Sequence, residues 1–462
     1  MIDRYRIKTK SNFNGEIDIL GSKSITNRAL ILAVLSENPV VLKNPLFSDD
    51  TIYMIKALRK LGNIIKISDD KKIIKITGNR ERIFNDGEIF VGNAGTAMRF
   101  LTSYVALGHG KIVLAGNERM NNRPIKELVD ALKNLGVQIN YLQKEGYPPI
   151  EIIADGIKNL DHDKKGNSYK EFENKKREIK ISGKNSSQYL SSILMVSPYI
   201  EGGVKIILDS EIISKPYVNM TIKMIKKFGA SIKKKETKQK ESFYEVEERK
   251  YNDIVEYTIE GDMSSASYFL ALSLITNSTI KINNFILDSL QGDIKILEIL
   301  KNLGLKVIEV GKDYIVVRGC EKYSGFNLDL NDTPDIVPTL AMVALFASSP
   351  TTIRNVESLR VKECDRIKAI CNEVKKLNGE IIEYQDGFKI IPKNSNEYNG
   401  NEIETYDDHR IAMSFSIAGF RIEGIEILDP FCVSKTFPTF YEELEKIYNC
   451  DGFDFGGNCE NE

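Results

Sequence analysis

A helix ending that returns along almost the whole of this 462-residue chain is the feature that most restricts its fold. In each copy, apolar residues precede a glycine or an Asn-Gly pair, and a strand-like run follows. Glycine readily adopts the left-handed conformation that closes a helix, so each copy predicts a helix that ends there. Five copies are clear and a sixth is weaker; their last apolar residues are Leu61, Leu135, Phe228, Leu303, Leu377 and Ile447.

Successive copies lie 70 to 75 residues apart, except for one step of 93 residues. The long step contains residues 158–178, which are almost wholly polar and which we interpret as a surface insertion or a loose hairpin. A second charged run, residues 233–250, does not lengthen its repeat and is expected to form an extended hairpin with a solvated face. Six units of this length predict two domains of three units each.

Each unit also contains an earlier helix that is more apolar than the one ending at the glycine. A helix that is apolar on most faces is buried, so these helices are expected to form an inner layer. Strand-like runs such as 111–114 and 204–208 lie between the helices. Each unit therefore has the order strand, helix, strand, helix, strands, which places the chain in the α/β class. The inner helices are predicted to begin near Ser24, Ala94, Ser186, Ser264, Thr333 and Asp408.

Composition and charge narrow the range of functions. The 64 basic and 65 acidic residues nearly cancel, so the overall charge does not point to a nucleic acid or a membrane. The six cysteines form no CxxC pair, which favours a reducing compartment. The chain begins without the apolar core of a signal peptide, and no apolar run reaches the roughly 18 residues that span a bilayer, so a cytoplasmic protein is expected. No HxxxH pair or Cys/His cluster suggests a metal.

The loop at residues 92–99, Gly-Asn-Ala-Gly-Thr-Ala-Met-Arg, is a candidate ligand site, although Gly-rich strand-to-helix turns are also ordinary connections. It follows the strand-like run 88–91 and opens an apolar helix. Small residues let a ligand approach the backbone, and the start of a helix offers free N–H groups to an anion. The loop at residues 21–28 is also polar, but it lacks the GxxxxGK[ST] pattern of a Walker-type phosphate loop.

Basic side chains recur in or near the first turns of the predicted helices. The helix dipole disfavours a cation there, so a repeated placement makes sense if an anion lies between the cations. One such residue would mean little, whereas eight favour a small polyanionic ligand. For a single Ser or Asp in these loops, helix capping is the better interpretation. The eight cations are Lys23, Arg28, Arg99, Arg123, Lys362, Arg366, Arg410 and Lys435.

Two carboxylates and one histidine are candidates for proton transfer. Asp335 heads the most apolar helix, and Glu363 lies between Lys362 and Arg366, where its ionisation can be tuned. Capping is as good an interpretation for Asp335, and a structural ion pair for Glu363. His409 follows two aspartates and is as consistent with capping or orienting as with acid–base chemistry.

At this point the motifs resemble those of one known family. In chain order they are GSKSITNRAL (21–30), GNAGTAMR (92–99), NRP (122–124), SSQYL (186–190), SKPY (214–217), PD (334–335), RVKECDR (360–366), DDHR (407–410) and SKTFP (434–438). They are similar to those of the EPSP synthases (3-phosphoshikimate 1-carboxyvinyltransferases, EC 2.5.1.19), and the resemblance extends over nearly the whole chain.

The resemblance implies the two-domain enolpyruvyl transferase fold, in which each domain is a threefold βαβαββ repeat forming an inside-out α/β barrel. The first domain is expected to be discontinuous, with residues 1–21 and 259–462, and the second to span 22–258. The active site is expected in the cleft between the domains.

The implied reaction transfers the enolpyruvyl group of phosphoenolpyruvate to the 5-hydroxyl of shikimate 3-phosphate and releases phosphate. It belongs to the shikimate pathway, which leads to chorismate and the aromatic amino acids. The chemistry needs a base near the hydroxyl, an acid near C3 and cations for two phosphates and two carboxylates. It needs no cofactor and no metal, and the chain is expected to act as a monomer.

The resemblance also assigns residue roles. Asp335 would accept a proton and Glu363 would donate one, with Lys23 and His409 close to the reacting atoms. Shikimate 3-phosphate would be held by Lys23, Ser24, Arg28, Ser186, Ser187, Gln188, Ser214, Asp335 and Lys362. Phosphoenolpyruvate would be held by Lys23, Gly95, Arg123, Gln188, Arg366, Arg410 and Lys435.

Three positions depart from the pattern of the family. Phe100 stands where many members carry proline, Ser358 where some carry asparagine, and Cys364 where threonine or serine is usual. These departures bear on inhibitor response more than on activity. Gly95 and Ala97 match members that are sensitive to glyphosate, so sensitivity is the expectation here.

Two other functions stay open at this point. A sister enolpyruvyl transferase acts on UDP-N-acetylglucosamine and usually carries a reactive cysteine in the loop that corresponds to residues 115–123, where this chain has none. A catalytically inactive member kept as a binding protein is the other alternative, although the intact charged set argues against it.

Overall fold

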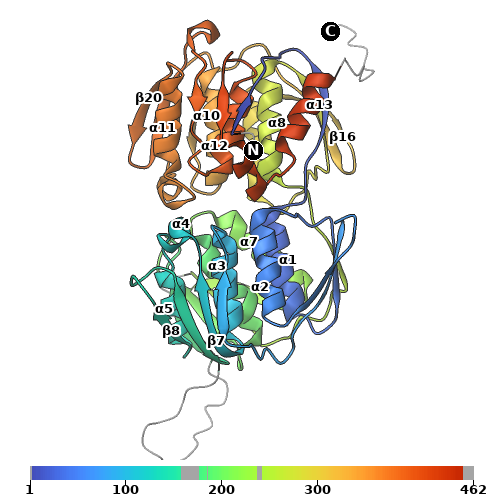
Figure 1. Cartoon of the computed structure of the whole chain (residues 1–462), viewed down its shortest axis with the longest axis vertical. Helices are drawn as coiled ribbons and strands as arrows, with labels where there is room; N and C mark the ends of the chain where they lie inside the picture. Colours follow the sequence, from blue (N-terminus) through green and yellow to red (C-terminus); the bar gives the residue numbers. More distant parts are fainter. Residues whose placement is uncertain (1–2, 158–175, 185, 237–241, 451–462) are drawn as a thin grey trace, which may run out of the picture. The chain divides into compact units, whose positions relative to one another are not determined.

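The computed structural model describes residues 3–157, 176–184, 186–236 and 242–450. Its contacts divide the chain into two compact units. Unit 1 comprises Met1–Gly21 and Glu260–Glu462, and unit 2 comprises Ser22–Ile259. Both units contain repeats of the same mixed α/β design, whose individual elements are drawn in Figure 1.

Unit 2 contains three four-stranded sheets with one common plan. In each sheet the first strand is parallel to the second, and the two remaining strands are antiparallel. Its strands are β3 Val40–Lys43, β4 Ile64–Ile67, β5 Ile73–Thr77, β6 Gly87–Phe90, β7 His109–Ala115, β8 Gln138–Tyr141, β9 Ile150–Asp155, β10 Arg177–Ile181, β11 Val204–Leu208, β12 Ile232–Glu236, β13 Ser242–Val246 and β14 Glu256–Thr258. The orders are β14-β3-β5-β4, β6-β7-β9-β8 and β10-β11-β13-β12.

The helices of unit 2 connect these strands as βαβαββ units. They are α1 Lys23–Leu35, α2 Asp49–Lys60, α3 Gly95–Ala106, α4 Glu118–Asn121, α5 Lys126–Asn134, α6 Ser187–Val196 and α7 Lys215–Lys227, with a 3₁₀ helix η1 Ser197–Tyr199. In the second repeat, for example, β6, α3, β7, α5, β8 and β9 follow one another along the chain, with α4 inserted before α5.

Unit 1 repeats the plan three times, with one change at its end. Its strands are β1 Arg4–Arg6, β2 Asn14–Asp18, β15 Thr279–Asn283, β16 Lys306–Val310, β17 Tyr314–Arg318, β18 Asn327–Asp329, β19 Thr351–Arg354, β20 Glu380–Tyr384, β21 Gly387–Ile391, β22 Glu402–Ile403 and β23 Glu426–Leu428. The described strands form the sheets β16-β17-β15-β2, β18-β19-β21-β20 and β1-β23-β22. In the last sheet the N-terminal strand β1 pairs antiparallel with β23, and Figure 1 shows this blue segment among the red elements of the same unit.

Unit 1 contains six α-helices among the described residues and several short 3₁₀ turns, some of which carry residues of the candidate site. The helices are α8 Met263–Thr276, α9 Lys295–Asn302, α10 Val337–Leu345, α11 Arg366–Lys376, α12 His409–Ala418 and α13 Phe440–Asn449. The 3₁₀ turns are η2 Gly292–Ile294, η3 Pro334–Ile336, η4 Glu357–Val361, η5 Ser395–Glu397 and η6 Pro430–Lys435.

The two units exchange their first strands. β2 precedes α1 in the chain, yet it lies parallel to β15 in unit 1. The repeat that contains α1 takes β14 as its first strand instead, parallel to β3. Unit 2 is one continuous stretch of chain, whereas unit 1 is formed from both ends, with β1 and β2 from the N-terminal side.

The inner helices are buried on nearly every face, as their apolar sequences predicted. Every residue of α10 is buried, and in α8 every residue except Ser264. In unit 1, α8, α10 and α12 pack against one another, and in unit 2 α3 packs against α1 and α6. Counting η3 as the start of the α10 segment, all six begin within one residue of the predicted positions. No helix in the described part of the chain is long and apolar enough to cross a membrane.

The predicted helix endings are also confirmed. α2 ends two residues before Gly62, which has φ 81°, and α5 ends two residues before Gly136, which has φ 90°. Such left-handed conformations strain residues with a Cβ, and this explains the glycine at the recurring position.

The charged runs have two outcomes. Residues 232–236 and 242–246 form the antiparallel pair β12 and β13, which confirms the hairpin predicted for the run 233–250. The predicted insertion lies mostly outside the described residues. Its C-terminal end was wrongly included, because Arg177 and Glu178 begin β10 and pair with β11.

The strand exchange predicts that unit 2 folds as a separate fragment. A fragment of residues 22–259 contains every strand of its three sheets, including β14 with the buried Tyr257. It should show native-like circular dichroism and a cooperative thermal transition. A matched fragment of residues 22–254 lacks β14 and leaves β3 as an edge strand, so it should melt about 5 °C lower or more. An unfolded 22–259 fragment would contradict the prediction.

Candidate functional site

Arg366 is the centre of a polar cluster in unit 1. Its neighbour Asp365 caps α11 by accepting a hydrogen bond from the Lys368 backbone N–H at 3.0 Å, which makes Arg366 the first residue of the helix. The buried guanidinium binds three carboxylates through three different nitrogens. Nε lies 2.7 Å from Asp408, Nη1 3.1 Å from Asp335 and Nη2 2.8 Å from Glu363.

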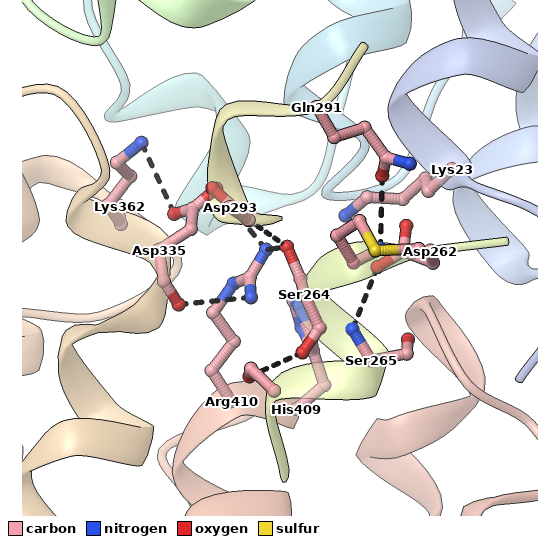
Figure 2. Close-up of polar contacts among 12 residues, drawn as sticks. Lys23, Asp262, Ser264, Ser265, Gln291, Asp293, Asp335, Lys362, His409 and Arg410 are labelled. Carbon is pink, nitrogen blue, oxygen red and sulfur yellow. Dashed lines mark hydrogen bonds and ion pairs between the residues drawn. The ribbon is translucent and has the colours of Figure 1, made fainter. Parts of the chain in front are cut away.

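Asp335 shares its carboxylate among several cations. It lies in η3, and it forms ion pairs with Arg366, with Arg410 at 3.2 Å and with Lys362 at 3.8 Å, two of which Figure 2 shows. Burial alone would raise the pKa of Asp335, but Arg410, Lys362 and Arg366 outweigh it and hold that pKa far below its usual range. The alternative of a helix cap is wrong, because Thr333 occupies the N-cap position of η3.

Glu363 forms the ion pairs that the sequence suggested. Its carboxylate lies 2.8 Å from Arg366 Nη2 and 3.5 Å from Lys435 Nζ. Lys435 is the last residue of η6, so this cation comes from a helix end and not from a first turn. The two carboxylates that were candidates for proton transfer therefore share one guanidinium.

His409 is buried at the start of α12, next to the helix cap. Asp408 accepts a hydrogen bond from the Arg410 backbone N–H at 2.8 Å, and its carboxylate lies 3.9 Å from His409 Nδ1. The same Asp408 carboxylate contacts Arg366 and the Cys364 thiol. Burial and Asp408 raise the pKa of the Cys364 thiol well above its usual range.

Asp293 belongs to this cluster and was missed from the sequence. It is a buried residue of η2 that accepts a hydrogen bond from the Ser264 hydroxyl. Arg410 Nη2 donates to the same hydroxyl oxygen at 3.3 Å, so Ser264 lies between Asp293 and Arg410 (Figure 2). Burial and the nearby Asp335 raise the pKa of Asp293 to about 6.

In unit 2, α1 presents its first residue to another carboxylate that the sequence search missed. The Ser22 hydroxyl caps α1, and Lys23 Nζ lies 3.3 Å from the buried carboxylate of Asp50 in α2. Asp50 and Asp293 both lie at or just before outer helices, in the first and fourth repeats. The sequence prediction for these loops used basic residues as its signal, and these two acidic residues were therefore not predicted.

Arg28 is a fully buried cation with an unusual environment. Its Nε donates to Thr221 Oγ1 at 2.7 Å, and Nη1 donates to the Ser24 carbonyl at 3.0 Å. No carboxylate of the described residues lies within ion-pair distance, and Nη2 forms no hydrogen bond to them. Burial lowers the pKa of Arg28 to about 10. A buried guanidinium with open donors is suited to an anionic ligand.

Gly95 and Arg123 lie against each other at the start of α3. A Cβ on Gly95 would come within 2.7 to 2.8 Å of the Arg123 guanidinium, so glycine allows that cation to lie over the helix start. No side chain caps this helix. Gln188 Nε2 donates to Thr96 Oγ1 at 3.2 Å, which ties α6 to the same helix start.

The serine candidates differ in what they do. Ser186 caps α6 by accepting from the Gln188 backbone N–H at 3.2 Å, as the capping interpretation predicted, and Ser187 is the buried first residue of that helix. Ser214 lies at the N-cap position of α7 with φ 51° and makes no capping hydrogen bond. A left-handed serine is strained, and such strain is often found at functional sites.

Arg99 has a structural position. Its Nη2 donates to the Pro124 carbonyl at 2.8 Å, and its Nη1 donates to the Gly95 carbonyl at 3.2 Å. These bonds hold the segment that carries Arg123 against α3. Arg99 therefore positions the anion-binding groups of the loop.

Chemically, each unit can bind anions. Unit 1 surrounds two candidate proton-transfer groups with Lys362, Arg366, Arg410 and Lys435, and unit 2 contributes Lys23, Arg28, Arg123 and the start of α3. Among residues 3–157, 176–184, 186–236 and 242–450, no group of three or more His, Cys, Asp and Glu side chains is arranged to hold a metal ion.

The raised pKa of Asp293 predicts a pH-dependent effect of Asp293→Asn on stability. In the folded chain the pKa is about 6, against an ordinary value of 3.8, so the wild-type protein loses stability as the pH rises through this range. The asparagine variant does not pay that cost. The difference in free energy of unfolding between the variant and the wild type, measured by urea unfolding, should increase in favour of the variant by up to about 3 kcal/mol from pH 4 to pH 7. Asp288→Asn, on an exposed residue, is the control and should show no such gain; a gain independent of pH in Asp293→Asn would contradict the prediction.

The chain matches a family of known proteins along most of its length. The family profile "EPSP synthase (3-phosphoshikimate 1-carboxyvinyltransferase)" matches residues 7–444. A curated 3-phosphoshikimate 1-carboxyvinyltransferase from Sulfurovum sp. (strain NBC37-1) is 40% identical over 435 residues, which cover 94% of this chain and 96% of the relative.

Solved structures share the fold. The EPSP synthase of Acinetobacter baumannii matches with a TM-score of 0.73 at 24% identity, over 96% of this chain and 97% of that chain. The enolpyruvyl transferase NikO from Streptomyces tendae matches with a TM-score of 0.72 at 14% identity, over the same shares of the two chains. With nearly the whole sequence matched by the profile and by a close relative, this chain belongs to the EPSP synthase family.

Proposed function

We propose a mechanism for the reaction of this family, in which the enolpyruvyl group of phosphoenolpyruvate is transferred to the 5-hydroxyl of shikimate 3-phosphate. The observation that carries the proposal is the buried cluster of unit 1. There Asp335 and Glu363 share Arg366 and are surrounded by three further cations. Two carboxylates for proton transfer and several cations for anionic groups are what this chemistry needs.

Shikimate 3-phosphate is held mainly by unit 2 in this proposal. Arg28 supplies guanidinium donors that no carboxylate of the described residues occupies. The residues that would hold it are Lys23, Ser24, Arg28, Ser186, Ser187, Gln188, Ser214, Asp335 and Lys362.

Phosphoenolpyruvate is held by cations of both units. Arg123 over the start of α3 and the guanidinium groups of Arg366 and Arg410 suit its phosphate and carboxylate. Lys23, Gly95, Gln188 and Lys435 complete the set. In this proposal both sets of binding residues include residues of each unit.

Asp335 accepts the proton of the 5-hydroxyl, and Glu363 donates a proton to C3, so that the hydroxyl oxygen adds to C2. The tetrahedral adduct then breaks its C2–O bond to phosphate and loses a methyl proton from C3, which returns to Glu363, while Asp335 gives its proton to the departing phosphate. The cations hold the pKa of Asp335 low, which makes it a weak base. Substrate anions that draw Arg366, Arg410 and Lys362 toward themselves would raise this pKa, so binding would strengthen the base. Lys23 and His409 lie close to the reacting atoms in this scheme.

The fold alone does not identify the acceptor substrate, because the enolpyruvyl transferase NikO shares it at only 14% identity. Residues 115–123 include α4 and hold no cysteine, whereas the sister enzymes that use UDP-N-acetylglucosamine usually carry one there. This difference favours shikimate 3-phosphate. We also expect the protein to be cytoplasmic and monomeric. Sedimentation of the purified protein would test its oligomeric state.

The direct test is phosphate release from phosphoenolpyruvate without added metal. Release is expected with shikimate 3-phosphate as the acceptor and not with UDP-N-acetylglucosamine. Release with the nucleotide sugar alone would move the chain to the sister activity. An absence of release with either acceptor, from a folded protein, would favour a binding protein without catalysis.

Removing either proton-transfer group should abolish most turnover while the protein still binds its substrates. Asp335→Asn and Glu363→Gln should each lower kcat by about 10²–10⁴-fold. Steady-state kinetics and calorimetric binding of shikimate 3-phosphate measure the two effects. Glu357→Gln, on an exposed residue of η4, is the matched control and should keep wild-type kcat. A variant of Asp335 or Glu363 with near-normal kcat would remove that residue from the mechanism.

A methyl group on Gly95 should displace Arg123 and weaken phosphoenolpyruvate binding. The contact is with the mobile end of a side chain, so Gly95→Ala should fold with nearly unchanged stability. The KM for phosphoenolpyruvate should rise about tenfold or more, and Gly95→Ser should raise it further. Inhibition by glyphosate, which resembles phosphoenolpyruvate, should weaken in parallel. Wild-type KM and wild-type inhibition in Gly95→Ala would show that Arg123 does not need this space.

A further inference from the structure

Phe100 is a buried residue to which the proposed function gives no role. It lies on α3, one residue beyond Arg99. The guanidinium carbon of Arg28 on α1 is 5.2 Å from the centre of the Phe100 ring. On α7, the Tyr217 ring centre is 5.9 Å from the same carbon. Both distances lie within the range of cation–π attraction.

These rings compensate in part for a missing counter-ion. Arg28 is fully buried, and no carboxylate of the described residues pairs with it. The negative face of an aromatic ring attracts a cation without accepting a proton or a conventional hydrogen bond. The rings can therefore keep the guanidinium charged and in place before any ligand binds.

The rings also leave N–H donors of the guanidinium available for a ligand. Its N–H groups all lie in its plane, and a carboxylate partner would occupy them. The guanidinium carbon lies over the Phe100 ring, while Thr221 and the Ser24 carbonyl accept one N–H each from Nε and Nη1. The remaining in-plane donors, including those of Nη2, are the ones that a phosphate uses in a bidentate contact.

We propose that Phe100 is a positioning residue for shikimate 3-phosphate, which offsets part of the buried charge of Arg28 and leaves guanidinium N–H groups available for an anionic group of the substrate. Tyr217 assists from α7. The proposal rests on the proposed function and adds to it a residue that acts through Arg28.

Fluorinated phenylalanines at position 100 test this proposal, because each fluorine weakens the ring's attraction for a cation while its shape changes little. We expect KM and Kd for shikimate 3-phosphate to rise about twofold with each added fluorine, with a much smaller change in KM for phosphoenolpyruvate. The same substitutions at Phe269, which packs against Phe437 and Phe440, are the matched control and should have no effect. Phe100→Leu, which removes the ring, should raise Kd about tenfold.

A substrate-independent reading comes from NMR of the free protein. The Nε–H resonance of Arg28, assigned with Arg28→Lys, should show a ring-current shift that Phe100→Leu removes. Stepwise affinities together with this shift would support the proposal. A flat fluorine series in a protein that binds shikimate 3-phosphate would overturn it and leave the proposed function intact. A wild-type protein without affinity for shikimate 3-phosphate would overturn both.

Discussion

The polar cluster of unit 1 depends on the burial of one guanidinium. Arg366 has almost no contact with solvent, and its charge is balanced by carboxylates from three separate segments, at Asp335, Glu363 and Asp408. Burying a cation is costly unless its charge is compensated, so the three carboxylates favour one arrangement of these segments around Arg366. Asp335 and Glu363 have fixed positions because both bind this group.

The buried cations of unit 1 and the buried Arg28 of unit 2 differ in the groups that compensate their charge. In unit 1 the cations are already paired with acids, so a bound anion must compete with those acids, and the competition alters their basicity. In unit 2, Arg28 is held by a hydroxyl, a carbonyl and aromatic rings. An anion there meets open donors. This contrast matches the roles we propose, with proton transfer in unit 1 and binding of an anionic substrate group by Arg28 in unit 2.

Much of the fold could be predicted because its signals are local. Apolar runs such as that of α10 indicate inner helices, and glycines such as Gly62 mark helix ends through backbone sterics that depend on a few neighbours. The exchange of β2 and β14 has no such signal. β14 pairs with residues 215 positions away and β2 with residues 265 positions away, and either strand has a pattern suited to either sheet.

The sequence by itself determined which side chains are available: the recurring cations, the two candidate carboxylates and the family they belong to. Only the tertiary structure decided how they are paired. It brought Asp293 and Asp50 to cations that lie far away or in another helix, and it placed Phe100 under Arg28. The physical reason is that charge compensation depends on distances of 3 to 5 Å between segments distant in sequence, and residue spacing along the chain does not encode those distances.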